Sequence, residues 1–600
     1  MREYLTSWFS GLFYIGEIFN RAFGKYKVPI AVLVALTLAG GILEGIGINS
    51  IIPLFSFVSR ESAPATDIIS TNMGALFALA HVPYNIKTLV IFITGLFVLK
   101  ALAIFYSAHL AALVTTSYEL ETRRSLVECT FGADWRYLTK QKVGHLDQLL
   151  TTATISSSNL LNNTALLTAS VSNILVYSFL VLNVSFWIAV STAVFGLTLL
   201  FVLRPLFRMT RKVSREVTAV YKELAHAVGE MLIGIKPIKS MHLEQEASMR
   251  SFGYFEHIRV ANRKLAFYRN ISAAMFQPIS IVFVFAVFLF FYKTSTLNLG
   301  MFAVIVYSIS KVFSYVQLSQ SQLHLLSALA PYTQAILDYT ADAAAHKERE
   351  GGGRPFCFSS TLSLRNVSFS YEQDAPTING VTFDIHKGET IGIVGPSGGG
   401  KTTLGDLLLG ILQPTSGTLT IDGTPLSEFD VTDLRRHVGY VSQDIFLLND
   451  TIENNIRFFN KSVTHEQMVA AATAANCMDF IERMPKGFQT MVGERGTLLS
   501  VGQRQRIALA RVLVRKPDIL ILDEATSSLD TDSEVLVQRA IENLHGKVTV
   551  VVIAHRLSTV MGADRILVVE KGNIIEEGAP QDLLKKKDSY FSNAYEQTRA

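Results

Sequence analysis

The sequence is poor in cysteine and in charge. Its 600 residues include only three cysteines (Cys129, Cys357 and Cys477), which have no metal-ligand spacing, and so sparse and odd a number argues against a disulfide framework. Charged residues make up 17% of the chain and hydrophobic residues 49%, a composition that favours a membrane protein. The net charge of +4 is small for this length, so no nucleic-acid partner is expected.

The N-terminus also lacks a small-residue cleavage site after a compact apolar core, which argues against a secretory signal peptide. Instead, large apolar side chains such as Leu5, Trp8 and Phe9 alternate with polar ones. This pattern predicts that residues 1–27 form an amphipathic helix in the membrane interface. The alternative is a soluble helix that packs on a core.

Several apolar stretches are long enough to cross about 30 Å of hydrocarbon, which takes roughly 20 residues. Together they predict an all-α transmembrane domain over residues 28–341. The six predicted spans lie near 28–58, 86–117, 160–183, 184–208, 270–292 and 299–327.

Lysine and arginine are concentrated in two of the connections, 118–159 and 204–269. By the positive-inside rule these connections and the N-terminus are cytoplasmic. Neither connection has a cluster of turn residues, so both are expected to be helices that extend beyond the membrane. Short helices near 134–143 and 229–239 are predicted where these connections bend, and we expect them to press on the second half of the chain.

A few polar side chains fall within the predicted spans, where they are costly. They line a polar translocation cavity, or else they pair with one another or snorkel to an interface. These residues are Glu44, Asn49, Lys100, Lys311 and His324. The basic side chains of Lys100, Arg204, Arg208 and Lys311 would suit a phosphate or pyrophosphate headgroup.

The composition changes to charged and then glycine-rich residues over 342–357, which predicts a linker. Beyond it, residues 358–600 alternate apolar strand-like runs with helical stretches, the pattern of an α/β domain. The fold class expected is therefore multidomain, with a transmembrane helical part followed by an α/β part.

A phosphate-binding motif opens the α/β part. It follows an apolar strand, precedes a helix and reads Gly395-Pro396-Ser397-Gly398-Gly399-Gly400-Lys401-Thr402. In that context the backbone N–H groups of the glycine loop cradle phosphates. Lys401 would reach the outer phosphates and the Thr402 hydroxyl would bind Mg²⁺. The sequence therefore predicts a site for a nucleoside triphosphate.

Two further apolar strands end in polar residues. Asp523 and Glu524 follow the strand 519–522, and His555 follows the strand 548–553. Parallel strands deliver such residues to the crevice where ligands bind. Asp523 is predicted to bind the metal, Glu524 to act as general base on the attacking water, and His555 to hydrogen-bond the γ-phosphate.

The run Leu499-Ser500-Val501-Gly502-Gln503 resembles the signature motif of ATP-binding cassette (ABC) transporters. The resemblance extends over the whole chain, because six spans before one P-loop ATPase cassette resemble the layout of an exporter half-transporter. It implies that Ser500 to Gln503 contact ATP, that Tyr371 stacks on adenine, and that Gln443 senses the γ-phosphate and the metal. It also implies that the loop Ser527-Ser528-Leu529-Asp530 crosses to a partner subunit. Thr403 follows Thr402 where a Ser-Thr pair is commoner, and Val501 replaces the usual glycine, so activity with altered affinity is expected.

The resemblance further implies ATP and Mg²⁺ as cofactors and a dimer, because the signature of one cassette closes over the ATP of another. Since all of the site residues are present, a homodimer is the simplest assembly; a heterodimer with a related half-transporter is the alternative.

Glu44, nine residues before Pro53, resembles a feature of bacterial half-transporters that flip lipid-linked oligosaccharides or export saccharides and glycolipids. We therefore expect ATP-driven export or flipping of an amphipathic substrate, a lipid-linked oligosaccharide or glycolipid above all, across the bacterial cytoplasmic membrane. Membrane lipids would surround the spans, and the cassette would lie in the cytoplasm. The alternatives are a drug or mature-peptide exporter, an importer, and an ATP-gated channel or regulatory receptor.

Overall fold

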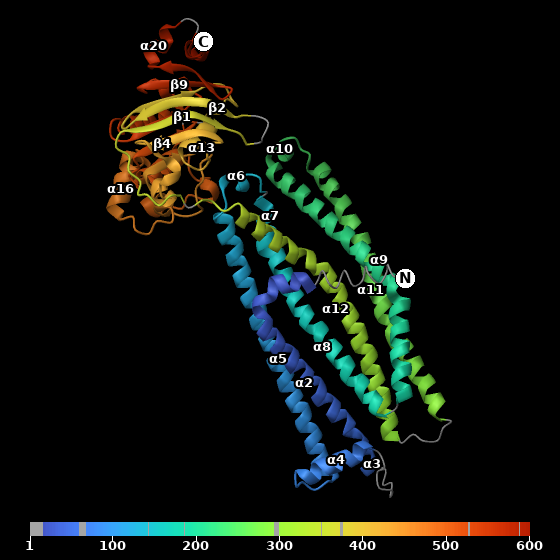
Figure 1. Cartoon of the computed structure of the whole chain (residues 1–600). Coiled ribbons are helices and arrows are strands. Elements are labelled where there is room, and N and C mark those ends of the chain that lie inside the picture. The colour runs from blue at the N-terminus through green and yellow to red at the C-terminus, as the bar shows by residue number, and fades with distance from the viewer. Residues whose placement is uncertain are drawn as a thin grey trace. The chain divides into compact units, whose positions relative to one another are not determined.

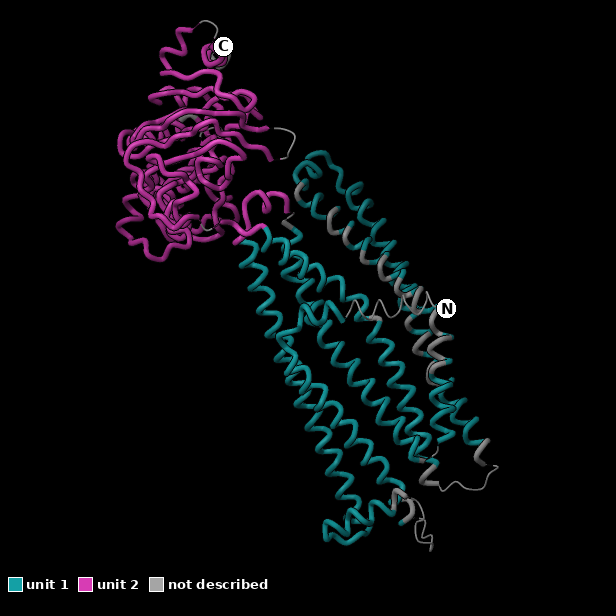
Figure 2. The backbone as a smooth tube through the Cα atoms, viewed as in Figure 1, with its two compact units in different colours: residues 1–131, 142–345 teal, residues 132–141, 346–600 magenta. Residues whose placement is uncertain are grey.

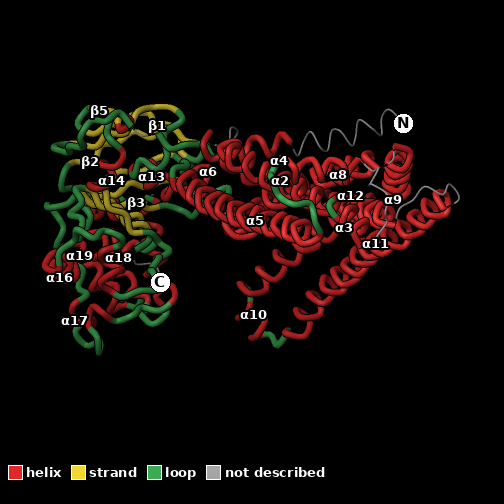
Figure 3. Tube along the Cα trace, turned by 90° about the horizontal axis from the view of Figure 1, so that it is seen from below, coloured by secondary structure: helices red, strands yellow, loops and turns green. Residues whose placement is uncertain are grey.

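The computed structural model describes residues 16–58, 68–141, 143–184, 186–292, 299–349, 351–371, 376–525, 529–586 and 589–599. The chain forms two compact units (Figure 2). We call residues 1–131 and 142–345 the helical unit, and residues 132–141 and 346–600 the sheet unit. In Figure 3 the strands all belong to the sheet unit.

Long helices dominate the helical unit (Figure 1). They are α2 (Lys27–Asn49), α5 (Ile86–Phe131), α8 (Thr154–Val184), α9 (Phe186–Ile233), α11 (Glu244–Tyr292) and α12 (Leu299–Ala345). Shorter elements connect them: η1 (Gly24–Tyr26), α3 (Ile51–Val58), α4 (Ile68–Leu79), α7 (Val143–Gln148), the π-helix η2 (Leu149–Ala153) and α10 (Ile235–Ser240). The main packing pairs are α8 with α12, α2 with α5, and α9 with α11.

Four stretches of the described helices are long and apolar enough to cross a membrane: Gly16–Leu54, Ile86–Phe131, Gly144–Asn183 and Phe302–Ala345. Shorter apolar stretches, Phe186–Gly196 and Pro278–Leu289, lie in α9 and α11. All six fall within or overlap the predicted spans, and the count of six spans stays a prediction.

The predicted amphipathic segment is described from residue 16 onward. Its apolar side chains Ile18 and Phe23 are buried in a cluster with Tyr118 and Leu160, and the Phe23 and Tyr118 rings lie 4.7 Å apart. This part of the segment therefore packs on the helical bundle, and its place in the membrane interface stays a prediction. Residues 1–15, with Leu5, Trp8 and Phe9, lie outside the described residues.

The sheet unit contains two sheets. The smaller one is antiparallel with the order β2-β1-β4-β5, built from β1 (Thr361–Phe369), β2 (Ile378–His386), β4 (Ser416–Ile421) and β5 (Thr424–Pro425). The larger one has the order β10-β9-β3-β8-β7-β6, built from β3 (Thr390–Val394), β6 (Val438–Val441), β7 (Ile519–Asp523), β8 (Thr549–Ile553), β9 (Arg565–Glu570) and β10 (Asn573–Gly578). Of these, β3 and β6 to β9 run parallel and β10 runs antiparallel.

Both faces of the larger sheet are covered around its parallel strands, which explains why these strands are apolar at nearly every position. Alternate residues of β7 enter two different core clusters: Leu520 packs with Ile507 of α18, and Ile521 packs with Leu404 of α13. The helices of this unit are α6 (Trp135–Leu138), α13 (Lys401–Leu408), α14 (Val431–His437), α15 (Ile452–Arg457), α16 (His465–Ala474), α17 (Met478–Ile481), α18 (Val501–Leu513), α19 (Thr531–Glu542), α20 (Pro580–Lys585) and α21 (Tyr590–Arg599). Single turns of 3₁₀ helix occur at Leu426–Glu428, Gly487–Gln489, Glu494–Gly496 and Leu557–Val560.

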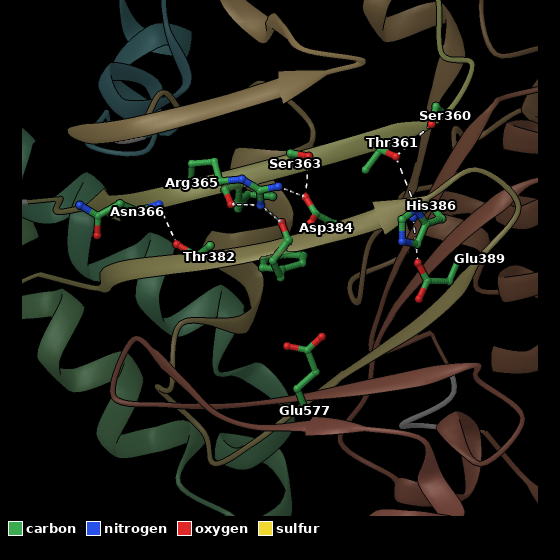
Figure 4. Close-up of polar contacts among 12 residues, drawn as sticks. Ser360, Thr361, Ser363, Arg365, Asn366, Thr382, Asp384, His386, Glu389 and Glu577 are labelled. Carbon is green, nitrogen blue, oxygen red and sulfur yellow. Dashed lines mark hydrogen bonds and ion pairs between the residues drawn. The ribbon is translucent and has the colours of Figure 1, made fainter.

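Polar pairs join β1 to β2 across the smaller sheet (Figure 4). Asp384 accepts hydrogen bonds from Ser363 and Arg365, each over 2.5 Å. The backbone N–H of Asn366 donates to the Thr382 hydroxyl over 2.8 Å, and the backbone of Asn366 is in the left-handed region. These cross-strand pairs help to fix the register of the two strands.

The first predicted short helix is α6, and it belongs to the sheet unit. Asp134 caps it by accepting a hydrogen bond from the Tyr137 N–H over 2.7 Å. The same segment exchanges backbone hydrogen bonds with the start of the linker: Asp134 donates to the His346 carbonyl and Glu348 donates to the Gly132 carbonyl, each over 2.9 Å. The second predicted short helix is α10, which lies in the helical unit, and its contact with the cassette stays a prediction.

The predicted linker of 342–357 begins too early. Helix α12 continues through Ala345, because three consecutive alanines favour helix and the glycines follow only at 351. The segment after α12 is held on the sheet unit, where Arg435 forms a two-point ion pair with Glu348 at 2.5 and 3.0 Å.

Candidate active site

The predicted phosphate loop connects β3 to α13, as its context required. Gly395 and Gly400 have φ angles of 147° and 103°, which L side chains rarely adopt. A Cβ atom on Gly395 would lie 2.0 Å from the Val569 carbonyl oxygen, and one on Gly400 would lie 2.8 Å from the Thr377 carbonyl oxygen. Glycine is therefore required both by the backbone angles and by the close approach of neighbouring backbone.

Lys401, the first residue of α13, curls back over this loop. Its ammonium group donates to the carbonyl oxygens of Gly395 at 2.9 Å and of Pro396 at 3.0 Å. The residue is 6% exposed, and burial lowers the pKa of its ammonium group. A buried ammonium bonded only to neutral carbonyls gains from an anion in the loop, since charge-assisted bonds are stronger than neutral ones.

The other predicted site residues follow the carboxyl ends of strands in the same sheet. Asp523 is level with Ile553 of β8, and Ile393 of β3 is level with the same residue. Because these strands are parallel, the ends of β3, β6, β7 and β8 reach one edge of the sheet. That edge holds the phosphate loop and the segments with Gln443, Glu524 and His555.

Two hydrogen bonds join these side chains in pairs. The Gln443 amide donates to the Glu524 carboxylate over 2.6 Å. The Ser397 hydroxyl lies 3.1 Å from the His555 Nε2 atom, within hydrogen-bonding distance. Glu524 has a φ of 49°, a strained backbone that is uncommon outside glycine and typical of functional sites.

Asp523 is 4% exposed, and burial raises the pKa of its carboxyl group. One carboxylate oxygen accepts a hydrogen bond from the Tyr440 hydroxyl at 3.3 Å, and the other, Oδ1, is buried and has no hydrogen-bond partner among the described residues. The Thr402 hydroxyl acts against the effect of burial and lowers the pKa of this carboxyl group, so it lies near Asp523. A buried unpaired carboxylate oxygen beside a hydroxyl fits a hard cation such as Mg²⁺. The described residues contain no cluster of three or more His, Cys, Asp or Glu that would hold a metal by themselves.

Tyr371 follows β1 and is half-buried. Its hydroxyl lies 3.4 Å from the Thr403 hydroxyl, and its ring meets Phe369 edge-on at 4.9 Å. Its carbonyl oxygen accepts a hydrogen bond from Arg136 of α6. The aromatic residue predicted to stack on adenine is thus held by contacts of its hydroxyl, its ring and its carbonyl group.

The predicted signature residues form the start of α18. The Ser500 hydroxyl accepts from the Gln503 N–H at 3.2 Å, and the Gln503 side chain accepts from the Ser500 N–H at 2.9 Å, a capping box. Gly502 packs against α19: a Cβ atom there would lie 2.2 Å from the Ser533 hydroxyl oxygen. Val501, the departure from the family pattern, is 38% exposed and fills no core position.

Asp530 caps α19 by accepting from the Ser533 N–H at 3.2 Å, and hydrogen bonding with Ser533 lowers the pKa of its carboxyl group. This capping explains the residue locally, and its contact with a nucleotide stays a prediction. Ser527 and Ser528 lie outside the described residues, as do the side chains of His324, Arg204 and Arg208.

Both parts of the chain are similar to known proteins. Residues 378–527 match the family "ABC transporter", and residues 46–316 match "ABC transporter transmembrane region". An ATP-dependent lipid A-core flippase from Shewanella denitrificans is 33% identical over 518 residues, covering 83% of this chain and 84% of its own. One from Shewanella sp. strain MR-4 is 30% identical over 593 residues, covering 96% of each chain.

The chain belongs to the ABC transporters. A solved bacterial Atm1-family ABC exporter with ATP bound has the same fold, with a TM-score of 0.76 at 22% identity over 96% of this chain and 100% of that one. The expected fold, a helical transmembrane domain fused to one cassette, is confirmed. This ABC transporter is a multi-pass membrane protein and a half-transporter that binds and hydrolyses ATP to drive transport.

Three residues near the site of this ABC transporter were not predicted. Tyr440 lies on β6, three residues before Gln443. Because β6 pairs with β7, the pairing of these strands could have predicted the contact of Tyr440 with Asp523. No sequence motif predicted the contact of Arg136 with Tyr371, because the two residues are far apart in the sequence. Asp406 of α13 is partly buried, and its burial, with Asp523 nearby, raises the pKa of its carboxyl group from 3.8 to about 6.

Replacing Gly502 with alanine should disrupt the packing of α18 on α19 and lower ATPase activity. The physical reason is the 2.2 Å approach of the new Cβ to Ser533. A second substitution, Ser533→Gly, removes both close atoms and should restore much of the activity. ATPase rates of the two single variants and the double variant test this. Equal loss in Gly502→Ala with and without Ser533→Gly would contradict the packing explanation.

The Asp406 carboxyl predicts a pH-dependent stability. Its pKa is higher in the folded state, so its contribution to stability is lost as the pH rises from about 4 to about 6, and the ionised group is a cost above pH 6. Asp406→Asn should therefore raise the Tm by a few degrees at pH 7.5, and by less at pH 5, in nucleotide-free buffer with EDTA. A gain that is the same at both pH values would argue against burial of the charge as the cause.

Proposed function

We propose that two copies of this chain form an ATP-driven flippase that moves an anionic glycolipid across the bacterial cytoplasmic membrane, with the sheet units in the cytoplasm. The substrate class rests on similarity to a protein named as an ATP-dependent lipid A-core flippase. This similarity covers 96% of this chain and 96% of the flippase chain. Similarity confined to the cassette would support only ATP hydrolysis, because cassettes serve transporters of many substrates.

The dimer is inferred from the contents of one chain. Each chain carries one phosphate loop and one signature segment, and the start of α18 presents Val501 at the surface of the sheet unit. In the proposed assembly Ser500, Val501, Gly502 and Gln503 of one copy approach the ATP of the other, and Asp530 lies in the loop that crosses between them. A homodimer has two complete sites, which is the simplest closed arrangement. Copurification of two differently tagged copies separates it from a heterodimer with another half-transporter.

Hydrolysis in the proposed site depends on the paired side chains at the sheet edge. Glu524 would accept a proton from the attacking water, with its carboxylate oriented by the Gln443 amide. His555, held near Ser397, would hydrogen-bond the γ-phosphate, and Lys401 would turn from the loop carbonyls to the β- and γ-phosphates. When bound by Thr402 and Asp523, with Gln443 nearby, Mg²⁺ would neutralise phosphate charge. Tyr371 and Thr403 would border the nucleotide.

Replacing Glu524 with glutamine should lower the ATPase rate by about 10²–10⁴-fold, because the amide cannot accept the proton. The variant should still bind ATP and accumulate as a closed dimer, detectable by crosslinking with ATP. Glu542→Gln, the same chemical change at an exposed position of α19, is the matched control and should retain activity. Wild-type turnover in Glu524→Gln would refute the assignment of the general base.

The substrate is tested in proteoliposomes that contain a headgroup-labelled, bis-phosphorylated disaccharide glycolipid. Wild-type protein with ATP and Mg²⁺ should move the label across the bilayer, and Glu524→Gln should not. ATPase activity raised by hydrophobic drugs or peptides, but not by the glycolipid, would favour a drug or peptide exporter. An ion current gated by ATP, without movement of lipid, would favour a channel.

A further inference from the structure

A cluster of charges lies among the apolar helices of the helical unit. Glu44 of α2 is 4% exposed, and its Oε1 atom lies 3.0 Å from the Lys100 ammonium of α5 and 3.7 Å from the Lys311 ammonium of α12. The Tyr307 hydroxyl donates to the same oxygen at 3.5 Å. Three helices therefore meet at one buried carboxylate.

The cluster lies deep within the predicted spans. Lys100 is 14 residues from the start of α5 and Lys311 is 12 residues from the start of α12, which corresponds to about 20 Å along each helix at 1.5 Å per residue. In a hydrocarbon layer of about 30 Å, that depth is far from either helix end. Ionisable groups at such a depth are costly and mark functional sites.

The charges of the cluster do not balance. Two ammonium groups share one carboxylate, so the cluster has a net charge of +1. Among the residues whose side chains the structure describes, neither lysine has an ion pair with a second carboxylate. A purely structural ion pair would need one lysine only. The second positive charge is compensated best by an anion that comes from elsewhere.

The two lysines differ in a way that identifies the one available to a ligand. Lys100 has the shorter ion pair with Glu44, and its side chain is 21% exposed. Lys311 has the longer one, and its side chain is 33% exposed. Lys100 thus suffices to neutralise Glu44, while Lys311 is free to exchange Glu44 for another anion.

Lys311 also lines a recess of about 270 Å³ on α12. The recess is formed by Tyr307, Ser310, Lys311, Ser314, Tyr315 and Leu318. Four of these residues carry hydroxyl groups, and the Lys311 nitrogen lies 5.3 Å and 5.9 Å from the centres of the Tyr307 and Tyr315 rings. Tyr315 is held in turn by stacking on the fully buried Tyr177, at 5.8 Å and 23°.

The chemistry of this recess suits a phosphorylated sugar. Hydroxyl donors and an ammonium bind phosphate oxygens, and aromatic rings provide flat apolar faces for a sugar ring. The volume is just below the range of about 300–1,000 Å³ for drug-sized ligands, so it holds a phosphate and part of one sugar rather than a whole lipid. A recess of this volume has no room for acyl chains, so those of such a ligand would lie against the apolar surfaces of the surrounding helices.

We propose that the recess at Lys311 is the subsite for the anionic headgroup of the transported lipid, and that Glu44 is the internal counter-ion that this headgroup displaces. Before binding, Glu44 neutralises Lys100 and part of the charge of Lys311. A phosphate that enters takes over Lys311, and Glu44 stays paired with Lys100. The proposal rests on the proposed function, and it adds which residues select for negative charge.

The experiment compares two probes in phosphatidylcholine vesicles: a bis-phosphorylated disaccharide glycolipid and its dephosphorylated counterpart. The half-saturating concentration for stimulation of ATPase activity is measured for each, together with direct binding to purified protein in detergent. In Lys311→Gln the half-saturating concentration of the phosphorylated lipid should rise roughly tenfold, with no change for the dephosphorylated one. Lys311→Arg should restore most of the selectivity.

Glu44→Gln gives an independent test in the opposite direction. Removing the competing carboxylate should lower the half-saturating concentration of the phosphorylated lipid, whereas a purely structural Glu44 would lower the Tm and leave selectivity unchanged. Lys264→Gln neutralises an exposed lysine of α11 in the same unit and serves as the matched control. Soluble inorganic pyrophosphate at the lipid's concentration should not compete; if it does, the subsite takes free phosphate and the lipid-linked assignment is wrong.

Failure of this proposal is distinguishable from failure of the proposed function. If the wild type flips the phosphorylated glycolipid and Lys311→Gln binds it equally well, the subsite is wrong and the flippase stands. If the wild type binds this lipid through Lys311 without flipping it, the subsite stands and the flippase is wrong. If the wild type neither binds nor flips it, both are overturned.

Discussion

The parallel arrangement of β3, β6, β7 and β8 is the constraint on which the candidate ATPase site depends. Parallel strands end at the same edge of a sheet, so residues separated by up to 160 positions in sequence meet there without any special loop. The hydrogen bonds between Gln443 and Glu524 and between Ser397 and His555 follow from this geometry. Successive residues of β7 pack alternately into two core clusters, and this packing keeps that edge in place.

Both units of the protein bury charge, and in both the arrangement leaves charge for a ligand. Among the described residues of the sheet unit, the Lys401 ammonium donates to two carbonyl oxygens, and the Asp523 Oδ1 atom has no hydrogen-bond partner. In the helical unit, Glu44 is shared by Lys100 and Lys311. Buried charges are stable when they are paired, so such incomplete pairing favours binding of a complementary ion.

The local motifs were predictable from sequence because each depends on short-range geometry. The phosphate loop needs glycines and a following helix, the capping box of Ser500 and Gln503 spans four residues, and continuous apolar runs marked the buried strands. By contrast, the strands β2, β4, β5 and β10 were not predicted; β5 has only two residues, and the other three contain glycine and polar residues that are depleted in strands, so their signal is weak. The roles of the site residues stay predictions.

The sequence by itself determined the family, the order of the membrane and cassette parts, and the residue types of the nucleotide site, because these depend on composition and on contiguous motifs. Only the tertiary structure decided which distant side chains meet. Arg136 reaches the Tyr371 carbonyl, Gly502 leaves room for Ser533, and Glu44 lies between Lys100 and Lys311. Such contacts depend on how helices and strands pack, and no local pattern of residues records the packing.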